Sequence, residues 1–147
     1  MRRFQFKLQR LLEFRKIREE QAQAEFAKAT RVFLQEKERM KILQEVLADT
    51  FNILKAQQEK SGPPIMLKMF QEYIDTTREG IRLQAAKVAV AAEFRQKCLK
   101  AFEEASRRRK AVDNLRERRL QQYQEEVLLE EQGFLDELAG QRYIRES

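Results

Sequence analysis

The sequence predicts an all-α fold in which two long helices form an antiparallel coiled-coil hairpin. The chain has 147 residues but only four glycines and two prolines, and charged residues make up 37% of it. Its mean hydropathy is -0.72, yet 42% of the residues are hydrophobic and ten are phenylalanine. A composition rich in good helix formers that still keeps its apolar residues is typical of coiled coils and unlike that of disordered chains.

The first predicted helix spans about residues 4–60. Along it, mostly apolar residues recur at alternating steps of four and three, the heptad pattern of a helix that packs against a partner helix. We call these positions the seam; in the first helix they are Leu8, Leu12, Arg15, Glu19, Ala22, Phe26, Ala29, Phe33, Glu36, Met40, Leu43, Leu47, Thr50 and Leu54.

A turn is predicted at Ser61 to Pro64, a stretch that contains both prolines of the chain and one of its glycines. Pro64 disfavours helical geometry at Pro63. Pro64 itself suits the first turn of a helix, because a backbone N–H at that position has no helical partner in any case. One helix is therefore expected to end before this stretch and the next to begin at Pro64.

The second predicted helix spans about residues 64–142, and its seam drifts in register toward the C-terminus. Because this helix is longer than the first, about its last 25 residues are expected to extend past the first helix. The whole chain, residues 1–147, is predicted to be a single coiled-coil domain. The seam positions of the second helix are Phe70, Ile74, Thr77, Ile81, Gln84, Val88, Ala91, Arg95, Cys98, Phe102 and Ala105, then Val112, Leu115, Leu120, Tyr123, Val127, Phe134 and Leu138.

The sequence argues against an enzyme. It contains no histidine, and it has no glycine-rich phosphate loop, cysteine pair or EF-hand spacing. The lone Cys98 lies in the seam and is expected to be a buried packing residue. A two-helix hairpin also has no concave interior that excludes water. We therefore expect no catalytic, cofactor or metal site, and the absence of a long apolar run or signal peptide predicts a cytosolic protein.

Charge is distributed unevenly toward the C-terminus. Basic residues dominate from Arg107 to Arg119, whereas residues 125–137 contain six acidic residues and no basic one. Together with a formal net charge of +6, the basic block favours an acidic partner. The run from Arg107 to Lys110 could neutralise phosphates, but no aromatic residues alternate with it and no nucleic-acid-binding module accompanies it. Nucleic acid is therefore not the favoured partner.

Two tracts at the ends of the chain resemble the FliJ family of flagellar protein-export components. They are the opening "FQFKLQRLLEFR" and the ending "LRERRLQQYQEEVLLEEQGFLDELAGQR", and together with the position of the turn they extend the resemblance over nearly the whole chain. The resemblance implies a non-enzymatic component of the bacterial flagellar type III export apparatus. Such a component is similar to the central stalk of rotary ATPases and lies in the cytoplasm at the inner face of the inner membrane.

The resemblance also implies two contact sites, and contact with export chaperones. The site for the export ATPase hexamer would comprise Phe4, Phe6, Leu8, Leu11, Leu12, Tyr123, Glu131, Gln132, Leu135, Asp136 and Glu137. The site for the cytoplasmic domain of an export-gate membrane protein would comprise Phe70, Tyr73, Ile74, Thr77 and Ile81.

Several alternatives remain open. Phe4 and Phe6 could fix the start of the first helix against the second instead of binding a partner. The chain could be the stalk protein of a virulence-type secretion system or of a rotary ATP synthase. It could also be a basic coiled coil that binds nucleic acid or anionic membrane. Binding of that last kind would weaken steeply with salt and would not depend on Phe4 or Leu8.

Overall fold

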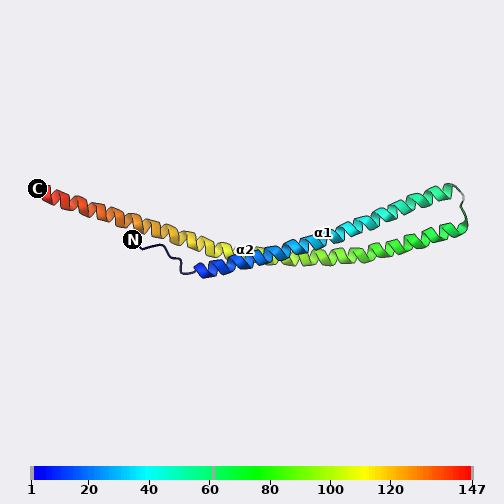
Figure 1. Cartoon of the computed structure of the whole chain (residues 1–147), viewed down its shortest axis with the longest axis horizontal. Helices are drawn as coiled ribbons and strands as arrows, with labels where there is room; N and C mark the ends of the chain where they lie inside the picture. Colours follow the sequence, from blue (N-terminus) through cyan, green and yellow to red (C-terminus); the bar gives the residue numbers. More distant parts are fainter. Residues whose placement is uncertain (1, 61, 147) are drawn as a thin grey trace. The chain divides into compact units, whose positions relative to one another are not determined.

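A computed structural model describes residues 2–60 and 62–146, and within them all regular secondary structure is helical. Helix α1 spans Gln9–Glu59 and helix α2 spans Pro64–Glu146. The two helices are joined as a hairpin and pack against each other in antiparallel directions (Figure 1). The predicted fold class is therefore confirmed.

The two helices contribute to two compact units. One unit is residues 21–102, which includes the turn and the helical segments on either side of it. The other unit combines residues 1–20 with residues 103–147, so that the start of α1 lies with the later part of α2. Each unit has interhelical contacts of its own.

The turn lies where the prolines predict it. Helix α1 ends at Glu59, and α2 begins at Pro64, so Pro64 occupies the first helical position, where its missing N–H costs nothing. The backbone N–H of Met66 donates to the carbonyl of Pro63 at 3.0 Å and closes the first turn of α2. Ser61, also part of the predicted turn, lies outside the described residues.

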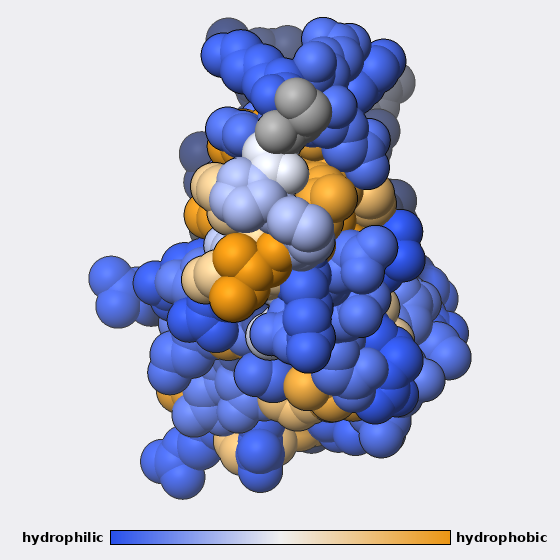
Figure 2. All heavy atoms as spheres, turned by 90° about the vertical axis from the view of Figure 1, so that its right-hand side faces the viewer, coloured by the Kyte–Doolittle hydropathy of each residue, from blue (hydrophilic) through white to orange (hydrophobic). Residues whose placement is uncertain are grey.

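Apolar side chains are exposed beside the turn. Ile65 and Met69 in the first turns of α2 are both more than half exposed. Figure 2, which faces the turn, shows such apolar surface set among hydrophilic side chains. The start of α2 therefore offers apolar surface that the hairpin itself does not cover.

Burial follows the predicted seam. From Leu12 to Leu54, each seam position of α1 is buried or half-buried, and so is each seam position of α2 from Phe70 to Val127. Leu12 is 1% exposed and Ala29 is 2% exposed. Three predicted seam positions are exposed instead: Leu8 at 39%, which precedes the first residue of α1, and Phe134 at 62% and Leu138 at 46% in the last part of α2.

Polar side chains in the seam of residues 21–102 are satisfied by specific partners. Gln84 on α2 donates through Nε2 to the backbone carbonyl of Glu36 on α1 at 2.9 Å and also to its carboxylate. Arg95 Nε donates to the Thr30 hydroxyl at 3.1 Å. A polar seam residue that finds its partner in only one alignment of the helices helps to fix that alignment.

Arg95 is also held by aromatic rings. Its guanidinium carbon lies 5.2 Å from the ring centroid of Phe26 and 5.7 Å from that of Phe33, distances at which a cation attracts the face of a ring. Arginine can therefore occupy a seam position here, because both its charge and one of its N–H groups have partners.

The last part of α2 is exposed along its whole length. From Leu128 to Glu146 each residue is exposed, including large apolar side chains. Helix α2 nevertheless continues to Glu146, four residues beyond the predicted end near residue 142, and passes through Gly133 and Gly140.

Replacing Gly133 and Gly140 with alanine is expected to stabilise this segment. An added Cβ would meet no atom within 4 Å at either position, and alanine favours a helix interior by about 0.5–1 kcal/mol over glycine. Hydrogen exchange of residues 130–146 should slow in the double variant. Gly62→Ala, a change outside both helices, serves as the control and should leave this exchange unaltered; equal exchange in all three proteins would contradict the prediction.

Candidate partner-binding sites

Residues 2–8, which we call the strap, precede α1 and are not helical. Helix α1 begins at Gln9, five residues after the predicted start near residue 4. Phe4 and Phe6 are half-buried, whereas Gln5 and Lys7 are exposed. Residues two apart share a side only in an extended chain, because in a helix they point in nearly opposite directions. An extended strap can thus turn both phenylalanines toward the protein.

The strap packs on α2 through Phe4. The ring of Phe4 lies 5.6 Å from that of Tyr123 between centroids, with the planes tilted by 46°. The guanidinium carbon of Arg116 lies 5.9 Å from the centroid of the Phe4 ring, and the Tyr123 hydroxyl donates to the backbone carbonyl of Arg2. Two of the predicted ATPase-binding residues, Phe4 and Tyr123, are therefore in contact with each other.

A shallow hollow of about 220 Å³ lies between the strap and α2. We call it the notch. Its walls combine aromatic rings, basic groups and one carboxylate, and they consist of Phe4, Gln5, Phe6, Lys7, Arg119, Gln122, Tyr123 and Glu126.

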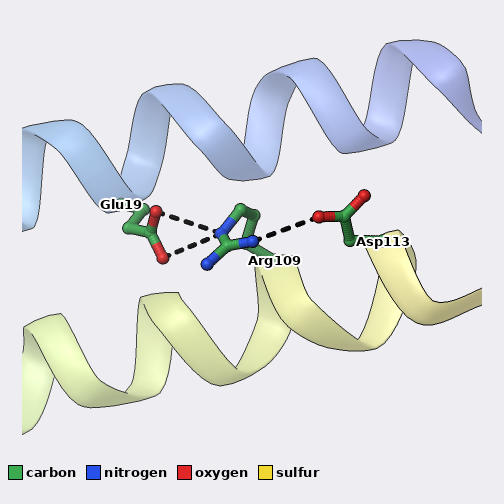
Figure 3. Close-up of polar contacts among 3 residues, drawn as sticks. All are labelled: Glu19, Arg109 and Asp113. Atoms are coloured by element: carbon green, nitrogen blue, oxygen red, sulfur yellow. Dashed lines mark hydrogen bonds and ion pairs between the residues drawn. The ribbon is translucent and has the colours of Figure 1, made fainter.

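In the unit that contains the strap, α1 and α2 are linked by an ionic network (Figure 3). Arg109 Nε on α2 donates to the two carboxylate oxygens of Glu19 on α1 at 3.0 Å and 2.9 Å. Its Nη1 donates to Asp113 at 3.2 Å. The side chains of Glu19 and Arg109 are mostly buried, so the pair is screened less than a surface ion pair. The polar seam position Glu19 thus has its partner across the helix pair.

The pKa of Glu19 lies below its ordinary value. Partial burial acts to raise the pKa, but hydrogen bonds from Arg109 and Ser106, with the attraction of Arg109 and Lys110, outweigh that effect. A lowered pKa in the folded state means that the ionised carboxylate stabilises the fold. This stabilisation is complete above the ordinary glutamate pKa and is lost as the pH falls through the lowered value.

Glu19→Gln is therefore expected to destabilise the protein in a pH-dependent way. At neutral pH the variant should lose about 0.5–1 kcal/mol of unfolding free energy, because the amide cannot replace the charge of the ion pair. As the pH falls below the ordinary glutamate pKa and through the lowered pKa of the folded state, the wild-type carboxylate becomes protonated and the difference should shrink. Urea unfolding at several pH values measures this. Glu38→Gln, which changes an exposed carboxylate, is the control, and a difference that stays constant with pH would contradict the prediction.

The remaining residues of the predicted ATPase-binding set differ in exposure. Leu12 is almost fully buried, Leu11 is half-buried, and Leu8 is exposed. The set members on the later part of α2 are all exposed, namely Glu131, Gln132, Leu135, Asp136 and Glu137. The set therefore combines accessible residues with one core residue, Leu12, whose side chain is buried.

The family model of the flagellar FliJ protein matches residues 4–147. The chain belongs to the flagellar FliJ protein family. FliJ proteins are non-catalytic components of the flagellar export apparatus, so this chain is a component of that apparatus. No curated protein and no solved structure matches it. In the described part of this FliJ chain, neither helix contains a stretch apolar and long enough for a membrane span.

The predicted gate-binding residues of the FliJ chain do not form one exposed surface. Ile74 and Thr77 are buried at 5% and 8% exposed, and the Thr77 hydroxyl donates to the Tyr73 carbonyl of its own helix at 2.8 Å. Phe70 and Ile81 are half-buried, and only Tyr73 is exposed, at 51%. The heptad pattern already places Ile74 and Thr77 in the seam, which explains why α1 covers them.

The basic residues of this FliJ protein differ in whether they are paired. In the tract from Arg107 to Lys110, Arg107 and Arg108 pair with Glu104 at 3.5 Å and 3.0 Å, and Arg109 pairs with Glu19. Three of the four basic residues in this tract therefore have an ion-pair partner, although Arg107 and Arg108 share the single carboxylate of Glu104.

A second group of basic residues gathers around the notch. Among the described residues no ion pair engages any of them. The group consists of Arg2, Arg3 and Lys7 on the strap and Arg116 and Arg119 on α2. The basic block from Arg107 to Arg119 is evident from the sequence, but which of its residues are paired is not, because which arginine meets a carboxylate depends on the alignment of the two helices.

Proposed function

We propose that this FliJ protein is an adaptor that binds the flagellar export ATPase ring at one site and the cytoplasmic domain of an export-gate membrane protein at another. The observation that carries the proposal is the exposed end of α2, where Leu128, Leu129, Phe134 and Leu135 are each more than 60% exposed. Apolar surface of this extent on an ordered helix favours a protein partner. Membership of the FliJ family favours the export apparatus as its source.

In this proposal the ATPase ring holds the strap and the end of α2. The gate protein contacts the beginning of α2 around Tyr73, where Ile65 and Met69 are also exposed. Helices that stay packed along a continuous seam can transmit a bias from one site to the other, so that the state of the ring alters the conformation of the gate. The protein would act at the cytoplasmic face of the inner membrane, held there by protein contacts, and would support flagellum assembly and motility. Export chaperones would be further partners.

Two single variants test the two contacts separately. Phe4→Ala changes the strap, which lies outside both helices, and Tyr73→Ala removes a side chain that is half exposed. In co-sedimentation with the purified ATPase hexamer, Phe4→Ala should bind more weakly and Tyr73→Ala should bind as the wild type does. With the purified gate domain the result should be reversed. Each variant controls for the other, and wild-type binding by both variants to both partners would refute the proposal.

A further inference from the structure

We infer that the notch is a docking site for an acidic protein segment that also carries apolar side chains. The inference deepens the proposed function, on which it rests for placing the segment on the ATPase ring. The chemistry of the ligand is argued from the notch alone.

The notch carries positive charge that is not paired. Lys7 and Arg119 line it, Arg2 and Arg3 lie on the same strap, and Arg116 covers the Phe4 ring. None of these groups has an ion pair among the residues that the structure describes. Like charges brought together by the docking of the strap on α2 repel one another, and a ligand of opposite charge relieves that repulsion. Arginine in particular binds carboxylates through two parallel hydrogen bonds.

Aromatic rings also line the notch. Phe4, Phe6 and Tyr123 all line the notch and are only half-buried. Contact with apolar side chains of a ligand would remove more of these rings from water. A ligand that matches both features carries carboxylates and apolar groups on the same short segment.

The walls of the notch fit nucleic acid less well. The Phe4 ring already contacts both the Tyr123 ring and the Arg116 guanidinium. It therefore does not offer an open face on which a base could stack. These observations favour a protein segment over a nucleic acid.

The test compares two variants of the full chain with equal charge change. Lys7→Glu/Arg119→Glu alters the notch, and Lys41→Glu/Lys55→Glu alters exposed residues of α1 in the other unit. The probe is a short fluorescein-labelled peptide of glutamate, leucine and phenylalanine, with binding followed by fluorescence anisotropy. We expect the wild type to bind it, the notch variant to bind at least about tenfold more weakly, and the Lys41/Lys55 variant to stay within about twofold of the wild type.

Other outcomes would overturn the inference. Equal loss in both variants would mean that the peptide responds only to net charge. Tighter binding of an oligothymidine than of the acidic peptide would make nucleic acid the ligand. Concentration-dependent dimerisation in analytical ultracentrifugation that the notch variant abolishes would make a second copy of the chain the occupant.

The same variants separate this inference from the proposed function. If the peptide binds as expected but the wild-type chain does not associate with the export ATPase, the proposed function fails and the acidic ligand chemistry stands. If the chain associates with the ATPase and the notch variant does so equally well, the notch is not the ATPase contact and the inference fails. If both ATPase and peptide binding depend on Lys7 and Arg119, both are supported.

Discussion

Ala29→Pro is expected to lower the free energy of unfolding by about 3 kcal/mol or more. Ala29 is 2% exposed and lies inside α1, far from either end of the helix. Proline there removes a backbone hydrogen bond, and its ring collides with the preceding turn. The resulting kink would also displace Phe26 and Phe33, which hold Arg95 between them in the seam. Urea unfolding followed by far-ultraviolet circular dichroism measures the loss.

Ala29→Gly is the matched control for this prediction. Glycine keeps the backbone N–H but lowers helix propensity by about 1 kcal/mol, so it reports the cost of a weaker helix former without a kink. The proline variant should be destabilised by clearly more than the glycine variant. Equal unfolding free energies for the two would show that α1 tolerates a break in the seam.

The same substitution bears on the proposed coupling. A kink in α1 leaves Tyr73 and the end of α2 unchanged in sequence, so the two partner-binding sites remain present. If continuous packing of the helices transmits the state of the ring to the gate, cells that carry Ala29→Pro should lose motility even where the variant protein still binds both partners. Full motility with both partners bound would exclude this mechanism.

The fold could be predicted because its signal repeats along the chain. Spacing alone identified buried residues as different as Ala29, Thr77 and Cys98, since the heptad pattern states which side of a helix faces its partner. The prolines located the turn because both of their effects, on the preceding residue and on the first helical position, point to the same place. Each of these inferences needs only local sequence.

The candidate sites could be predicted only in part. The heptad pattern assigned Leu8 to the seam, and the predicted first helix therefore included Phe4 and Phe6. The alternation of these two phenylalanines with polar residues, which indicates an extended segment, was not recognised. The pairing of Glu19 with Arg109 was also missed, because Arg109 lies where the seam of α2 drifts in register. Which residues meet across two helices depends on how far the helical repeat drifts from the heptad repeat along each helix. That accumulated drift could not be read from the single sequence.

Removing residues 128–146 is expected to abolish most of the association with the export ATPase while leaving the stability of the remaining chain unchanged. Each of these residues is exposed, so their removal uncovers no core, and the unfolding free energy should change by less than about 0.5 kcal/mol. Loss of the apolar side chains that the proposed function assigns to the ring should weaken binding by at least about tenfold. Thermal unfolding and ATPase co-sedimentation of the same preparation measure both quantities.

A second variant shows whether the apolar side chains or merely the length of the helix matter for this binding. Leu135→Gln/Leu138→Gln keeps the full chain and replaces two exposed leucines with residues of similar helix propensity. If burial of apolar surface drives the association, this variant should lose affinity nearly as the truncated chain does, because glutamine brings no comparable gain on leaving water. If it binds as the wild type does while the truncated chain does not, the helix backbone or its acidic residues make the contact. Should the truncated chain itself bind normally, the end of α2 is not the ATPase-binding site, and the strap alone would have to supply it.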